Sequence, residues 1–119
     1  MELPHILIVQ TDTPKRNALM SILRRNKMKC TGVAEAILAL KQIEHEHYDL
    51  IIIIDHFEDM PGQELVGLIK NHSLKNKVIF VSSTPDAEEQ KMAEAMLVDQ
   101  YMPDYSDKNI LLKSIKRLL

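Results

Sequence analysis

The sequence predicts an α/β domain in which five strands alternate with five helices, forming a three-layer, doubly wound sandwich around an all-parallel sheet. Three observations predict this fold class. Short apolar runs alternate with amphipathic segments along all 119 residues. Runs such as Leu50–Ile54 are apolar at every position, as in parallel strands that helices cover on both faces. The length suits one domain with its own core, so we expect a single domain spanning 1–119.

The first half of the chain predicts three strands and two helices. The run at 6–9 is apolar throughout and predicts a buried strand. A Thr-Pro pair then begins a helix at 13–26, whose leucine and isoleucine residues recur at helical spacing. Lys29–Val33 is a weaker strand candidate, and apolar periodicity predicts a second helix at 34–47. Leu50–Ile54, with five consecutive apolar residues, is the clearest strand of the chain.

The second half continues the same alternation. A helix is predicted at 64–71, followed by an apolar strand at Val78–Val81. A second Thr-Pro pair precedes a helix at 86–96, which has acidic residues in its first turn. A short strand at 99–102 and an amphipathic helix at 108–119 complete the fifth strand–helix unit.

Details of the helices follow from the same patterns. Thr13 and Thr84, each followed by proline, are typical of an N-cap and the first helical position. In the helix at 64–71, the spacing places Leu65, Leu68 and Ile69 on the inward face.

Composition excludes several classes of function. The net charge of −2 gives no basic surface of the kind that binds nucleic acid. Cys30 is the only cysteine, so no intrachain disulfide can form, and we expect it to be a buried or half-buried space filler. No apolar run is long enough to span a bilayer, and the first residues lack a secretory pattern. We therefore expect a cytoplasmic protein with neither a membrane nor a nucleic-acid partner.

Polar residues follow four of the five strands. Because the carboxyl ends of parallel strands meet at one edge of the sheet, ligands and chemistry gather there. An acid-rich first end, then Asp, Ser or Thr, and Lys, would be typical of a phosphate-handling site. Here the corresponding residues along the chain are Gln10, Thr11, Asp12, Asp55, Ser82, Ser83 and Asp104. The set predicts a site from which several parts are missing.

The five strand–helix units with these polar ends resemble the receiver domain of bacterial response regulators in two-component, phosphorelay signalling. The resemblance covers essentially the whole chain and implies a flavodoxin-like, CheY-like fold with strand order 2-1-3-4-5. In that family an acid pair after the first strand binds a divalent cation, and the third strand ends in the phosphoacceptor Asp. Ser or Thr ends the fourth strand, and the fifth carries a switch aromatic followed by Lys-Pro.

Matched position by position, only part of this set is present. Ser82 falls on the Ser/Thr position and Tyr101 on the switch aromatic, and both are chemical matches. Gln10 and Thr11 fall on the acid pair, with Asp12 one place beyond it. Because Mg²⁺ prefers carboxylate oxygens, the loss of both acids should weaken metal binding strongly.

The end of the fifth strand departs further from the family. Asp104 falls on the invariant Lys of the family and Tyr105 on its Pro. A carboxylate at the lysine position would repel a phosphoryl group that the lysine attracts. The resemblance therefore implies a degenerate receiver without standard phosphoryl chemistry.

The phosphoacceptor position itself is ambiguous. The family's spacing, counted forward from Asp49 or backward from Gly62, reaches Ile54, so the candidate acceptor Asp55 lies one residue late. A slip of one residue in a strand sends the side chain to the opposite face. A bulge or an early strand end would bring Asp55 back to the site.

Two further features near Asp55 have alternative interpretations. The carboxylates in this region form either a substitute cation site or, as we favour, an acidic solvated rim; they are Asp12, Asp55, Glu58, Asp59 and Asp104. His56 is either a modulator of the pocket or, as we favour, an ordinary loop residue.

The favoured hypothesis is a pseudo-receiver, not an enzyme, that binds a protein partner through the face formed by 86–119, with Tyr101 as its switch. It needs no cofactor. The alternative is an atypical but active phosphoacceptor that uses Asp55 and Mg²⁺, with autophosphorylation as its only catalysis. A third option, an unrelated flavodoxin-like domain for a small ligand, is disfavoured because no Gly-rich phosphate loop is present. A weak homodimer through the last third of the chain is also compatible with the sequence.

Overall fold

The structure, a computed structural model, describes residues 2–73, 75–103 and 107–119. Within these ranges one five-stranded sheet is present, and all its pairings are parallel. The strands are His5–Val9 (β1), Lys29–Val33 (β2), Leu50–Ile54 (β3), Val78–Val81 (β4) and Gln100–Met102 (β5). Their order in the sheet is β2-β1-β3-β4-β5. The predicted fold class and strand order are confirmed.

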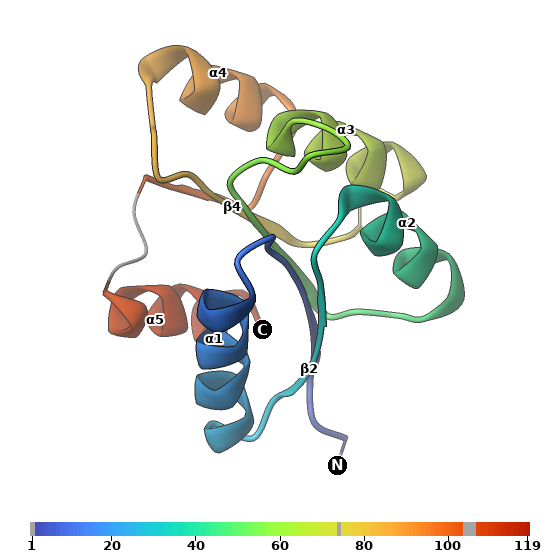
Figure 1. Ribbon diagram of the computed structural model, residues 1–119, viewed down its shortest axis with the longest axis vertical. Coiled ribbons are helices and arrows are strands. Elements are labelled where there is room, and N and C mark those ends of the chain that lie inside the picture. Colours follow the sequence, from blue (N-terminus) through green and yellow to red (C-terminus); the bar gives the residue numbers. More distant parts are fainter. Residues whose placement is uncertain (1, 74, 104–106) are drawn as a thin grey trace.

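Helices cover both faces of the sheet. Thr13–Arg25 (α1) and Lys108–Leu118 (α5) lie on one face, while α2, α3 and α4 lie on the other (Figure 1). These three helices are Ala36–His45 (α2), Gly62–His72 (α3) and Ala87–Ala95 (α4). No helix in the described part of the chain is long and apolar enough to cross a membrane.

The core consists of two layers separated by the sheet. Every residue of β3 is buried, and successive side chains point to opposite faces. Ile51 and Ile53 pack in the cluster under α2, α3 and α4, while Ile52 and Ile54 pack under α1 and α5. Burial of one such side chain stabilises the fold by about 1.5–3 kcal/mol. The fully apolar sequence of β3 thus explains its central position.

The ends of the helices correct two predictions. Asp12, not Thr13, is the N-cap of α1, because its carboxylate accepts a hydrogen bond from the Lys15 N–H at 3.0 Å. Asp86, not Thr84, is the N-cap of α4, with its carboxylate 2.7 Å from the Glu89 nitrogen. Asp12 precedes its Thr-Pro pair and Asp86 follows its own, and each carboxylate accepts a hydrogen bond from a free N–H group at the start of the helix.

Leu68 was also predicted wrongly. It is 40% exposed, whereas Leu65, Val66 and Ile69 are fully buried. The buried face of α3 therefore includes Val66 in place of Leu68. Cys30, by contrast, is half-buried as predicted, and burial raises the pKa of its thiol.

The loop between β3 and α3 caps a different helix. Asp59 accepts hydrogen bonds from the Ala36 and Ile37 N–H groups at 3.1 and 2.9 Å, at the start of α2. The residue in the N-cap position, Glu35, makes no such bond through its side chain. These backbone bonds, that to Ile37 first, lower the pKa of Asp59, so its charged form stabilises the junction between the loop and α2.

Candidate functional site

The predicted site lies at the edge of the sheet where the strands end. Gln10, Asp55 and Ser82 directly follow β1, β3 and β4, and each extends the backbone ladder by one bond to the neighbouring strand. The Gln10 nitrogen donates to the Val33 carbonyl, and the Asp55 nitrogen to the Val81 carbonyl. The sheet therefore brings these three residues to one edge.

The residues at and next to the acid-pair positions make hydrogen bonds to neighbouring segments. Gln10 is buried, and its backbone carbonyl oxygen accepts a hydrogen bond from the Arg16 guanidinium at 2.6 Å. The Thr11 hydroxyl donates to the Ala34 carbonyl at 3.3 Å. Asp12 is exposed and caps α1. The end of β1 thus supplies an amide, a hydroxyl and a carboxylate that is already hydrogen-bonded.

Asp55 is the first residue beyond β3 and has a left-handed backbone, with φ of 61°. Its Oδ1 accepts hydrogen bonds from the Ser83 nitrogen at 2.6 Å and from the Ser83 hydroxyl at 2.8 Å. The preceding residue, Ile54, pairs with Val81 in the sheet and is buried in the core. The carboxylate of Asp55 therefore faces the loop after β4 and is bound by Ser83.

The carboxylates described near this edge contact separate segments of the chain. Across residues 2–73, 75–103 and 107–119, no three His, Cys, Asp or Glu side chains converge in a way that could hold a metal ion. Asp12, Asp55 and Asp59 each hydrogen-bond a different segment, at α1, Ser83 and α2 respectively. Mg²⁺ requires several oxygen ligands at short distance around one point. The residues here instead fix loops and helix ends.

Ser82, directly after β4, and Tyr101, on the adjacent strand β5, lie near the same edge of the sheet. Ser82 is fully buried, and its nitrogen donates to the Met102 carbonyl at 3.0 Å. The Tyr101 ring packs edge-on against Phe80, with 5.8 Å between ring centroids. Burial, followed by the hydrogen bond and charge of Glu89, raises the pKa of Tyr101 to about 12, while a side-chain hydrogen bond with Ser82 opposes the rise.

Sequence reasoning missed Glu89 and did not anticipate the contacts of His56. The Tyr101 hydroxyl donates to Oε1 of Glu89 at 2.6 Å, and Nε2 of His56 lies 3.4 Å from Oε2. His56, in the loop between β3 and α3, also accepts a hydrogen bond from the Gly62 N–H through Nδ1 at 2.8 Å. A glutamate in the first turn of a helix is common, and nothing in the sequence distinguishes this one.

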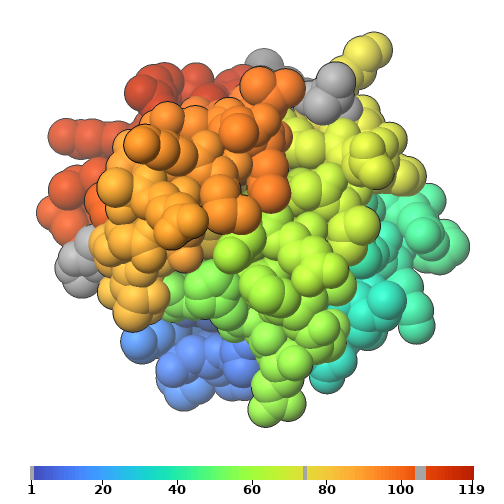
Figure 2. Space-filling model, turned by 90° about the horizontal axis from the view of Figure 1, so that it is seen from above, coloured from blue at the N-terminus to red at the C-terminus, as the bar shows by residue number. Residues whose placement is uncertain are grey.

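The remaining predicted positions concern the last third of the chain. Asp104 and Tyr105 lie outside the described residues. Along the 86–119 face, exposed apolar side chains lie on or just after α4 and α5: they are Met92, Leu97, Ile110 and Leu119. Figure 2 looks onto the part of the surface where α4 lies beside α3, and these two helices are in contact.

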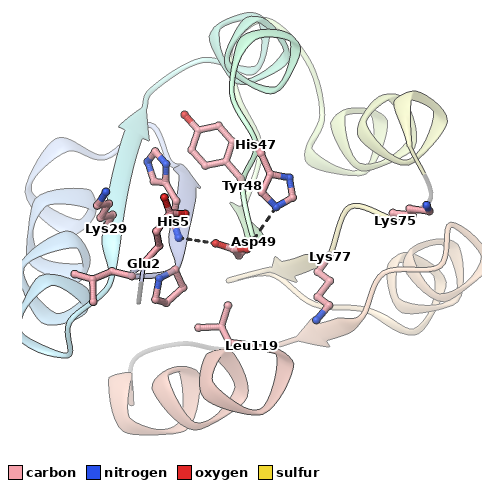
Figure 3. Close-up of a pocket in the computed structure, with 11 residues that line it drawn as sticks. Glu2, His5, Lys29, His47, Tyr48, Asp49, Lys75, Lys77 and Leu119 are labelled. Carbon is pink, nitrogen blue, oxygen red and sulfur yellow. Dashed lines mark hydrogen bonds and ion pairs between the residues drawn. The ribbon is translucent and has the colours of Figure 1, made fainter.

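A cavity of about 700 Å³ lies at the opposite edge of the sheet, where the strands begin (Figure 3). Asp49 accepts a hydrogen bond from the His5 nitrogen at 2.8 Å and lies 3.4 Å from Nε2 of His47. Lys29 and Lys77 also line this cavity. These residues connect the beginnings of strands and are separated by the length of the sheet from Asp55.

Comparisons with known proteins agree with the topology. A CheY-like receiver domain from Methanospirillum hungatei has 27% sequence identity and a TM-score of 0.93, over 98% of this chain and 93% of that one. The regulator TrrA from Thermotoga maritima, solved with Mg²⁺ and BeF, has 22% identity and a TM-score of 0.89, over 98% and 100%. CheY4 of Vibrio cholerae has 18% identity and a TM-score of 0.88, over 98% and 99%.

Sequence comparison gives a family but no individual relative. No curated protein matches the chain in a direct sequence comparison. The model of the response regulator receiver domain matches residues 6–117, which is nearly the whole length. The topology, the site at the carboxyl edge of the sheet and this match agree: the chain belongs to the response regulator receiver domain family.

Proposed function

We propose that this receiver domain acts as a pseudo-receiver, which binds a protein partner through the 86–119 face without Mg²⁺-dependent phosphorylation. Receiver domains are signalling modules that interact with proteins such as kinases and effectors. In this domain, a fixed binding surface takes the place of control by a phosphoryl group.

The observation that carries the proposal is the chemistry at the end of β1. Gln10 and Thr11 supply no carboxylate, and the Thr11 hydroxyl is committed to the Ala34 carbonyl. Phosphoryl transfer depends on positioned positive charge, largely from metal ions, to stabilise the charge on the transferred group. A site that cannot concentrate Mg²⁺ should lose orders of magnitude in the rate of phosphorylation.

The position of Asp55 gives independent support. The Ser83 nitrogen and hydroxyl both hydrogen-bond the same carboxylate oxygen of Asp55. Hydrogen bonds to a charged group are stronger than neutral ones, so these two bonds make this oxygen a weaker nucleophile toward phosphorus. The family's acceptor position falls on Ile54, whose side chain is part of the core.

The test is the intact mass of the protein after incubation with acetyl phosphate and Mg²⁺, with Asp55→Asn as the control. We expect no phosphate-sized gain in the folded wild-type protein. A gain that Asp55→Asn abolishes would overturn the proposal and make this chain an active phosphoacceptor. A known active receiver domain treated in parallel establishes that the phosphodonor is competent.

A further inference from the structure

Glu89 is a buried carboxylate for which the proposed function has no role. It lies in the first turn of α4 and is 9% exposed. A carboxylate removed from water is costly unless hydrogen bonds replace its hydration. Both of its oxygens have partners, since Oε1 accepts from Tyr101 at 2.6 Å and Oε2 faces Nε2 of His56 at 3.4 Å. Glu89 thus joins the switch aromatic on β5 to the loop after β3.

Tyr101 is held at two points. Its ring packs edge-on against Phe80, a core residue that is fully buried. Its hydroxyl makes a 2.6 Å bond to the charged Glu89, a length typical of charge-assisted O–H···O bonds. If the ring were held by packing alone, outward rotation of the side chain would break no hydrogen bond to a charged group. The bond to Glu89 adds a specific cost to that rotation.

The geometry also fixes the tautomer of neutral His56. The Gly62 N–H is a donor and points at Nδ1 of His56, so Nδ1 acts as an acceptor and carries no proton. The proton of the neutral imidazole therefore lies on Nε2, which faces Glu89. His56 thus contacts the Gly62 N–H through one ring nitrogen and lies near the Glu89 carboxylate with the other.

We infer that Glu89 is a positioning residue that holds Tyr101 against the sheet without any phosphoryl group, and that His56 connects this hold to the loop after Asp55. The inference rests on the proposed function, for it supplies what replaces phosphorylation in fixing the 86–119 face. The contacts that carry it come from three separate elements: the loop after β3, α4 and β5.

The experiment measures how far each tyrosine ring is shielded from a soluble paramagnetic agent, by NMR of protein labelled at the tyrosine ring carbons. The chain has three tyrosines, and Tyr101→Phe identifies the signal of interest. No phosphodonor is present. We expect Tyr101 to be shielded in the wild-type protein and exposed in Glu89→Ala. Because hydrogen bonds to charged groups are the stronger class, the inward-to-outward ratio should fall by about ten- to a hundredfold.

Two further variants separate the hold from a general structural effect. Glu89→Gln keeps an acceptor oxygen but removes the charge, so Tyr101 should lose less of its shielding than in Glu89→Ala. His56→Ala should have a smaller effect still, because its contact with Glu89 is longer, at 3.4 Å. Cooperative unfolding in urea establishes that each variant is folded.

The inference fails if Tyr101 in a folded Glu89→Ala is as shielded as in the wild-type protein. If that variant does not fold, the wild-type protein still decides: a Tyr101 ring as accessible as free tyrosine, or a neutral His56 protonated on Nδ1 in a long-range ¹H–¹⁵N spectrum, overturns it. Phosphate uptake on Asp55 would instead refute the proposed function, and the shielding of Tyr101 would be unaffected by that result.

Discussion

Replacement of Gly62 by alanine should destabilise the protein, and the structure gives the reason. A Cβ atom on Gly62 would lie 2.1 Å from the carbonyl oxygen of Asp55 and 2.8 Å from the Phe80 ring. Carbon and oxygen atoms rarely approach closer than about 3.3 Å even in favourable C–H···O contacts. One of the two groups must therefore move by about 1 Å, and both are fixed, one in the backbone and one in the core.

The size of the effect follows from two opposing terms. Overpacking of a rigid site costs about 1–3 kcal/mol. Alanine in place of glycine in a helix gains about 0.5–1 kcal/mol, and less at the first position of the helix than in its interior. We expect a net loss of about 1–2 kcal/mol for Gly62→Ala, since the overpacking term is the larger.

Gly67 in the same helix is the matched control. A Cβ atom there would meet only the Met96 side chain, at 3.8 and 4.0 Å, which is ordinary van der Waals contact. Gly67→Ala should therefore be stabilising by about 0.5–1 kcal/mol. Urea unfolding of both variants gives the comparison, and the tautomer of His56 reports whether the Gly62 N–H has moved. Equal stability changes of the same sign in the two variants would refute the reasoning.

Three other predictions concern buried or charged contacts. Asp59→Ala should lower the free energy of unfolding by about 0.5–2 kcal/mol near neutral pH, as for other lost helix caps. Because the pKa of Asp59 is lowered in the folded protein, this difference should shrink as the pH falls below 3.8. Urea unfolding at several pH values measures it. The pKa of Tyr101 is raised to about 12, so the stability that its protonated hydroxyl contributes should be lost as the pH rises from 10 towards 12. In that range the unfolding free energy of Tyr101→Phe should depend less on pH than that of the wild-type protein. Lys70→Met should cost about 1–3 kcal/mol in urea unfolding, because Nζ of the buried Lys70 bonds the Asp99 carboxylate at 3.2 Å; no change in stability would contradict this.

The central strands β1, β3 and β4 were predictable because each contains a continuous apolar run with a polar end. Leu50–Ile54 and Val78–Val81 have the predicted bounds, since burial on both faces leaves no polar position inside the strand. The helix ends were less predictable. Asp86, the residue directly after the Thr84-Pro85 pair, caps α4 because its carboxylate accepts a hydrogen bond from the Glu89 N–H. Local sequence allows either cap, and the loop geometry selects one.

The site was predictable in its location but not in its contacts. Residues such as Ser82 and Tyr101 reach the edge of the sheet because strand ends do so in every parallel sheet. The pairing of Glu89 with Tyr101 and His56 depends on how α4 packs over β4 and β5. It joins residues that are 12 and 33 positions from Glu89, and no periodicity encodes such distances.

The backbone conformation of Asp55 determines where its carboxylate lies. With φ of 61°, Asp55 ends β3 in the left-handed region, where Asn and Asp are tolerated better than other non-glycine residues. The turn directs the carboxylate to Ser83, neither into the core like Ile54 nor along the strand. Counting residues from Asp49 or Gly62 assumes regular strand geometry up to the acceptor. Regular geometry stops after Ile54, because Asp55 has a left-handed backbone.

The same conformation makes Asp55→Asn a conservative change and Asp55→Ala a disruptive one. Asparagine tolerates the left-handed region and keeps an acceptor oxygen for Ser83, so its stability should lie within about 0.5 kcal/mol of the wild type. Alanine loses both advantages and should cost about 1–3 kcal/mol through backbone strain. Urea unfolding of the two variants tests this. Equal stabilities would mean that the turn does not depend on the residue at 55, and that Asp55 is held there for a reason other than the fold.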